Sequence, residues 1–197
     1  MSTTIMPRLA ASFGALYVFL LFGGSASGID ALMPLELAAL VLFVPFVAYL
    51  YSVLRTAEGD GGWLAPTVLG AGLLDTAIKL SSAAPSLASR DLREGSQLDL
   101  VLHDMNNASF ILTMYPLAVL TGASAIVILA TRVLPRWLGW GGAVTAAALA
   151  ANGWFLEAEF APAFLLFLLW TVTTSFVLVR RAGAARREPA PEPILAA

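Results

Sequence analysis

The sequence contains no cysteine, a single histidine and few charged residues, and each shortage excludes a class of protein. Without cysteine the chain has no disulfides, thiolate metal sites or cysteine nucleophiles. His103 alone cannot form a His-rich zinc or copper site, or hold a haem between two histidines, within one chain. The 11 basic residues are outnumbered by 13 acidic ones and form no concentrated basic face, so no nucleic-acid partner is expected.

Apolar residues, by contrast, are abundant: 59% of the 197 residues are hydrophobic and the mean hydropathy is +0.82. A helix of about 20 residues crosses a hydrocarbon core of ~30 Å, and a window of this length finds six candidate spans. We therefore predict an all-α, polytopic transmembrane bundle of six helices in one domain, residues 1–181, followed by a disordered cytoplasmic tail, residues 182–197. The predicted spans are 9–28, 35–54, 63–83, 106–131, 137–156 and 161–179.

The distribution of arginine predicts the orientation of the bundle, because cytoplasmic loops are enriched in basic residues. If the N-terminus is cytoplasmic, the outer loops contain only Arg90 and Arg93. The inner side then contains Arg8, Arg55, Arg132, Arg136, Arg180, Arg181, Arg186 and Arg187. We therefore expect both termini in the cytoplasm and a multi-pass protein of the cell inner (plasma) membrane, with the lipid bilayer as its partner.

The first span has two interpretations. Arg8, a short apolar run and the small residues Ser25-Ala-Ser27 resemble a cleavable signal peptide, and cleavage would leave five helices. The length of the apolar stretch favours a retained first helix.

Small and bulky residues predict how the helices pack. Gly142, Ala146 and Ala150 have the spacing that lets two membrane helices approach closely, so we expect the fifth helix to be central. The sixth span is rich in bulky residues, including Trp170, and is expected to face lipid. Tryptophans mark the membrane interfaces at the span ends, namely Trp63, Trp137, Trp140 and Trp154.

The most informative polar residues are Asp75 and Lys79, which lie four apart within the third span. A charge at the centre of a bilayer costs about 2.5–3.5 kcal/mol on insertion scales, so it persists where it faces a partner, a cavity or water. At this spacing the two side chains share one helical face and can neutralise each other.

Possible partners precede the fourth span. Ser96 followed by Asp99 resembles a capping box and predicts a helix that starts near Gln97 and continues into the membrane. We expect an outward-facing polar pocket between the third and fourth helices. Its candidate ligand-binding or ion-pairing residues are Asp75, Lys79, His103, Asp104 and Asn107. The same residues are also compatible with an ion pair and interhelical hydrogen bonds that only fix helix register, so both interpretations stay open.

Two resemblances bear on this chain. The turn from Leu74 to Lys79 resembles the Asp-x-x-x-Lys turn of microbial rhodopsins, where such a lysine binds retinal as a Schiff base. It lies on the third of six helices rather than the last of seven, without the Arg- and Trp-bearing retinal helix, so we predict no cofactor. The segment Leu134-Pro-Arg-Trp-Leu-Gly-Trp140 is similar to one in multi-helix membrane proteins of high-GC bacteria, a resemblance that implies architecture only.

Sequence motifs of enzymes are absent: there is no His-Glu-x-x-His, P-loop or dinucleotide fingerprint. We therefore expect a non-enzymatic membrane protein with a small-ligand-binding, sensing or accessory role, whose partner is a small molecule or another membrane protein. The alternative is a small proton-coupled secondary transporter, which with only six helices is expected to act as a homo-oligomer.

Overall fold

The computed structural model describes residues 5–26, 29–89, 92–155 and 161–184, and these residues form six α-helices and no strand. The predicted all-α bundle of six helices is confirmed. The helices are α1 (Ile5–Ala26), α2 (Ile29–Glu58), α3 (Leu64–Ser89), α4 (Gln97–Thr131), α5 (Arg136–Phe155) and α6 (Ala161–Ala184). The predicted tail lies outside the described residues, except that 182–184 form the last turn of α6.

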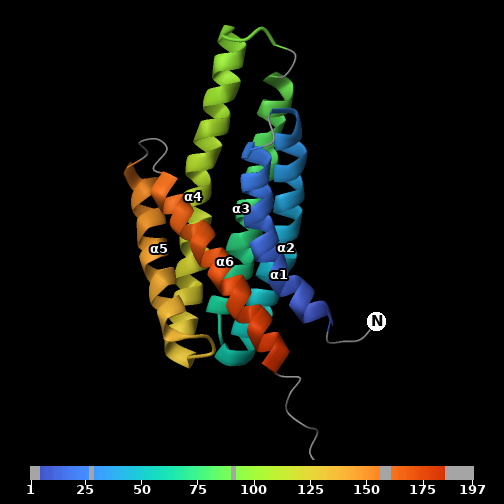
Figure 1. The fold of residues 1–197 in the computed structure, drawn as a ribbon. Coiled ribbons are helices and arrows are strands. Elements are labelled where there is room, and N and C mark those ends of the chain that lie inside the picture. The colour runs from blue at the N-terminus through green and yellow to red at the C-terminus, as the bar shows by residue number, and fades with distance from the viewer. Residues whose placement is uncertain (1–4, 27–28, 90–91, 156–160, 185–197) are drawn as a thin grey trace, which may run out of the picture.

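The six helices form a closed ring. Each helix packs against its neighbours in the chain, and α6 returns to pack against α1 (Figure 1). The start of α1 and the end of α6 meet at one end of the ring, where a Cβ on Gly183 would collide with the guanidinium group of Arg8. We call this the terminal end; the α2–α3 and α4–α5 turns also lie there, and the opposite end carries the α3–α4 connection.

The start of α4 is fixed by the predicted cap. The backbone N–H of Asp99 donates to Ser96 Oγ at 3.2 Å, and Gly95 N–H donates to Asp99 Oδ2 at 3.0 Å, so the two side chains satisfy donors at the helix start. The predicted start near Gln97 is confirmed. With 35 residues α4 is about 52 Å long, and its first turns rise above the other helices (Figure 1).

Two side chains organise the α2–α3 turn. The guanidinium group of Arg55 donates to the carbonyl oxygens of Gly62 and Asp60 at 2.6 and 2.8 Å. The Glu58 carboxylate accepts from the N–H groups of Leu64 and Ala65 at 2.9 and 2.8 Å, so it caps the start of α3. The direction in which α3 enters the ring is therefore set by residues of the preceding helix.

Glycines bring α4 and α5 together. A Cβ built on Gly142 would lie 3.3 Å from both Ala125 Cβ and Thr121 O, and one built on Gly122 would lie 3.5 Å from Ala146 Cβ. The predicted close approach of the fifth helix is thus present. The expectation that α5 is central was wrong, because α5 has only α4 and α6 as its principal neighbours in the ring.

The expectation that the sixth helix faces lipid was also wrong for one side of α6. Phe167 is fully buried and Trp170 is 3% exposed, because α6 closes the ring between α5 and α1. Trp170 Nε1 donates to the carbonyl oxygen of Leu138 at 3.1 Å and so fastens α6 to α5. Bulky residues such as Leu169 and Phe176 cover the outer side of the helix.

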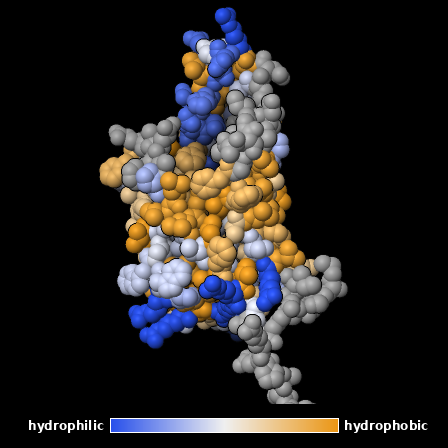
Figure 2. Space-filling model, viewed as in Figure 1, coloured by the Kyte–Doolittle hydropathy of each residue, from blue (hydrophilic) through white to orange (hydrophobic). Residues whose placement is uncertain are grey.

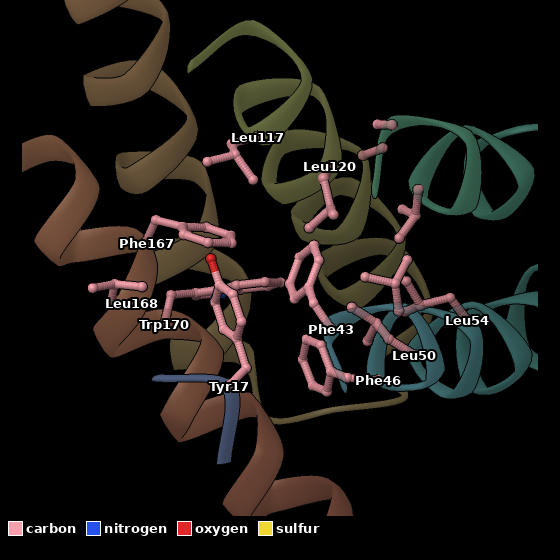
Figure 3. Close-up of a cluster of buried hydrophobic side chains, with 14 of the residues drawn as sticks. Tyr17, Phe43, Phe46, Leu50, Leu54, Leu117, Leu120, Phe167, Leu168 and Trp170 are labelled. Atoms are coloured by element: carbon pink, nitrogen blue, oxygen red, sulfur yellow. The ribbon is translucent and has the colours of Figure 1, made fainter. Parts of the chain in front are cut away.

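Aromatic rings fill the middle of the ring of helices (Figure 3). Tyr17 of α1 stacks on Phe43 of α2 with centroids 4.8 Å apart, and Phe43 meets Phe167 of α6 edge to face at 6.1 Å. Phe164 of α6 packs against Phe167, and Phe110 of α4 meets Phe164 with centroids 5.3 Å apart, so the chain of ring contacts reaches α4. Rings in such contact hold non-adjacent helices in register by dispersion and quadrupole attraction.

The outer surface suits a bilayer. An apolar band crosses the middle of the face shown in Figure 2, with polar residues gathered at both ends. Among the described residues, three helical segments are long and apolar enough to cross a membrane, namely Pro34–Glu58, Gln97–Thr131 and Pro162–Gly183. Helices α1, α3 and α5 run beside them in the same ring (Figure 1). The four tryptophans predicted at span ends are 58–75% exposed.

Candidate functional site

Asp75 is buried within the ring. The stripe of α3 that contains Val68, Gly72, Asp75 and Lys79 turns inward, since a Cβ on Gly72 would meet both Val47 of α2 and Leu120 of α4. Asp75 is 2% exposed, and its Oδ1 has no hydrogen-bond partner among the described residues. An acceptor left unpaired in the interior costs about 1–3 kcal/mol, so this oxygen is suited to receiving a hydrogen bond from a bound molecule.

Lys79 does not pair directly with Asp75. Its Nζ lies 4.1 Å from the ring centroid of Phe110 on α4, a cation–π contact worth about 2 kcal/mol where water is excluded. No hydrogen bond or ion pair joins Lys79 to Asp75 in the described part of the chain, although their charges attract across one helical turn. The ammonium group is therefore held beside Asp75 and leaves Oδ1 open.

Two further polar residues complete the site. Glu36 of α2 is half-buried, and its carboxylate attracts the ammonium group of Lys79. The phenol of Tyr17, on α1 across the ring, is 3% exposed and experiences the charges of both Asp75 and Glu36. We call Tyr17, Glu36, Asp75 and Lys79 the charged cluster; three helices supply its members and Phe110 adds an aromatic face from a fourth.

Sequence reasoning missed Glu36 and Tyr17 as site residues. Glu36 lies at the start of the second predicted span, and Tyr17 lies within an otherwise apolar first span. A usable signal existed for Glu36, because a carboxylate just inside an apolar run is as unusual as Asp75. Nothing in the sequence indicated that Tyr17 turns inward.

The other predicted site residues lie apart from the charged cluster. His103, Asp104 and Asn107 are exposed on the first turns of α4, in the part that rises above the ring. No hydrogen bond or ion pair links them to Asp75 or Lys79 in the described chain. The structure thus brings Asp75 and Lys79 together at the α3–α4 interface and leaves His103, Asp104 and Asn107 on the approach to it, where ligand binding by them stays a prediction.

Known proteins and metal chemistry give no further guide to this site. Comparison with protein-family models, curated proteins and solved structures finds no match for this chain. Within the described residues no group of three or more His, Asp or Glu side chains is placed to hold a metal ion. Function has to be argued from the charged cluster itself.

Proposed function

We propose that the protein is a multi-pass protein of the cell inner membrane, with cytoplasmic termini and an outward-facing site for a small ligand. Arginine-rich segments at the terminal end support this orientation. The observation that carries the proposal is the burial of Asp75 with its Oδ1 unpaired. A site of this kind suits a ligand-binding or sensing role and needs no catalytic group.

The charges of the cluster indicate the chemistry of the ligand. Two carboxylates, Glu36 and Asp75, face one ammonium group, Lys79, which leaves one excess negative charge when all three are ionised. The unpaired oxygen requires a hydrogen-bond donor, and the ring of Tyr17 offers an aromatic face that attracts cations, whereas the Phe110 ring already holds the ammonium group of Lys79. We therefore infer that the ligand is a small protonated amine.

The test is a thermal-stability titration of the full-length protein in detergent with methylammonium and, separately, tetramethylammonium. A ligand that binds only the folded state stabilises it by about 2.7 kcal/mol at a hundred times Kd, which raises the Tm by several degrees. Methylammonium should raise the Tm more than tetramethylammonium, which has no N–H to donate to Asp75.

The matched variants are Asp75→Asn and Asp60→Asn. Each removes one carboxylate charge, but Asp60 is exposed in the α2–α3 turn at the terminal end, away from the charged cluster and from its approach. Asp75→Asn should abolish the methylammonium response, and Asp60→Asn should keep it. An equal response in both variants, or none in the unmodified protein, would contradict the proposal.

Secondary transport is the second candidate function. It is favoured because Asp75 lies inside the ring and Lys79 lies one helical turn nearer the end that we propose to face outward. In that role Asp75 exchanges a proton against the ligand. Sealed vesicles should then take up methylammonium faster than protein-free vesicles under the same imposed pH gradient, Asp75→Asn should remove this excess rate, and the purified protein should be a homo-oligomer. Binding without uptake, together with co-purification of a larger membrane complex, would instead support an accessory role.

A further inference from the structure

The interior of the ring contains a second polar group, made of hydroxyls rather than charges. Ser124 on α4 and Thr171 and Thr174 on α6 are each 0% exposed. Their oxygens have no hydrogen-bond partner among the described residues, and Ser175 shares this property. Buried hydroxyls are normally hydrogen-bonded, so four without a partner require an explanation.

Other buried threonines of this chain show the usual solution. Thr76, Thr113, Thr121 and Thr145 donate to a backbone carbonyl three or four residues earlier in their own helix, at 2.6–2.9 Å. The four unpaired hydroxyls make no such bond. Each therefore keeps a donor and an acceptor that a small polar molecule such as water could satisfy.

Helical periodicity places these hydroxyls on the inner faces of their helices. Thr171 and Thr174 follow the fully buried Phe167 by four and seven residues, and Ser124 follows Leu117 by seven. Ser175 turns instead toward α1, since a Cβ on Gly14 would collide with its Oγ. We call Ser124, Thr171 and Thr174 the hydroxyl layer.

The hydroxyl layer lies between the charged cluster and the terminal end of the ring. A Cβ on Gly72, three residues before Asp75, would meet Leu120 of α4. Ser124 follows Leu120 by one helical turn. On the other side of the ring Phe167 of α6 meets Phe43 of α2 edge to face. Beyond Phe167 the helix α6 descends toward the terminal end, as α4 does beyond Leu117 (Figure 1). Lys79 follows Asp75 in the opposite direction, so the hydroxyls lie on the far side of Asp75 from Lys79.

We propose that the hydroxyl layer binds internal water and gives the carboxyl group of Asp75 a route for protons toward the terminal end. Water supplies the donors and acceptors that the protein leaves unmade, and a polar site of this kind is where buried water is found. When the carboxyl O–H bond breaks, the proton adds to a neighbouring water and moves on by exchange between water molecules. The proposed hydration depends only on the unpaired hydroxyls, whereas the proposed proton route depends also on the proposed function of Asp75.

Cysteine accessibility tests the hydration, and the chain has no native cysteine to interfere. Ser124→Cys and Thr174→Cys in the full-length detergent-solubilised protein would be treated with aminoethyl methanethiosulfonate, which reacts with the thiolate form that water permits. The control is Leu149→Cys, equally buried but packed on the apolar face of α5. Both hydroxyl-layer cysteines should react at least about tenfold faster than the control; equal rates would overturn the hydration.

The double variant Thr171→Val/Thr174→Val gives an independent readout. If the hydroxyls are dry, valine removes two unpaired polar groups and the Tm rises; if they hold water, valine removes hydrogen bonds and the Tm falls. We expect a fall, and a rise overturns the hydration. Thr121→Val, whose hydroxyl donates to Leu117 O, calibrates the loss of one satisfied hydroxyl.

A measurement of proton flux tests the proposed proton route separately from the proposed ligand site. In liposomes containing a pH-sensitive dye, the double valine variant should slow the decay of an imposed pH gradient, and unchanged decay would overturn the route. Asp75→Asn should leave the cysteine reaction rates unchanged while it abolishes the methylammonium response. Failure of the proposed ligand and failure of the hydroxyl layer are therefore distinguishable.

Discussion

At the scale of single residues, Asp75 is a buried carboxylate whose Oδ1 has no hydrogen-bond partner among the described residues. A buried carboxylate without a direct partner is destabilising, and proteins commonly retain such a cost where function requires it. A carboxylate that only fixed helix register would instead stabilise the bundle through its attraction to the charge of Lys79. The two roles therefore predict opposite effects on stability when the charge is removed.

We predict that Asp75→Leu, which keeps the branched shape of the side chain, raises the Tm by several degrees. Replacing an unpaired buried polar group by an apolar one of similar shape gains about 1–3 kcal/mol, and each kcal/mol corresponds to about 2–4 °C at this chain length. Thermal unfolding in detergent measures the shift, with the exposed Asp104→Leu as control. A lower Tm for Asp75→Leu would show that the residue is structural.

The sequence predicted Asp75 and Lys79 as interior residues because the cost of a charge in hydrocarbon is a local property of the chain. It did not predict that Lys79 would rest on Phe110, since that contact depends on the register of α3 against α4. Glu36 and Tyr17 join the site only because the ring brings α1 and α2 to face α3. No local pattern encodes that closure.

At the scale of helices, the α4–α5 interface depends on glycines that have no room for a side chain. A Cβ on Gly142 would lie 2.9 Å from Trp170 Nε1, whereas one on the adjacent Gly141 meets nothing closer than 3.9 Å. These two neighbours therefore provide a matched pair in which helix propensity is the same and packing differs.

We predict that Gly142→Ala lowers the Tm because the methyl group pushes α5 away from α4 and disturbs the Trp170–Leu138 hydrogen bond. Overpacking of this kind costs about 1–3 kcal/mol. Gly141→Ala should be neutral or stabilise by about 0.5–1 kcal/mol, because alanine favours the helix. Thermal unfolding of both variants provides the measurement; an equal loss in the two would contradict tight packing at Gly142.

Helix ends were more predictable than helix neighbours. The Ser96–Asp99 cap gave the start of α4 from four consecutive residues, because capping hydrogen bonds are local. The placement of α5 and α6 could not be read in the same way. Small residues on α5 correctly indicated a close approach, but a central position depends on how α6 closes on α1.

At the scale of the whole molecule, the two ends of the ring differ in charge, and only at one of them does α4 extend beyond the other helices. Six of the seven described arginines, namely Arg8, Arg55, Arg132, Arg136, Arg180 and Arg181, belong to segments at the terminal end, whereas Arg93 lies in the α3–α4 connection at the other end. Asp60 lies in the α2–α3 turn at that end and Glu94 in the α3–α4 connection at the other.

The orientation predicts which end an impermeant maleimide reaches. Glu94→Cys should be labelled in intact cells and Asp60→Cys only after the membrane is opened, with the cysteine-free parent protein as the blank. Labelling in the reverse order would invert the topology. Labelling of both from one side would contradict a ring that spans the bilayer.

The raised start of α4 also affects how fast a cation arrives. Residues 92–105 contain the carboxylates of Glu94, Asp99 and Asp104 against the guanidinium of Arg93, a net charge of −2 with His103 neutral. This negative potential stands above the approach to the charged cluster and draws cations inward from solution. Screening shortens its reach from about 10 Å at 0.1 M salt to about 3 Å at 1 M, so we expect capture of the proposed cationic ligand to become slower at high salt, with little effect on the buried contacts proposed to retain it.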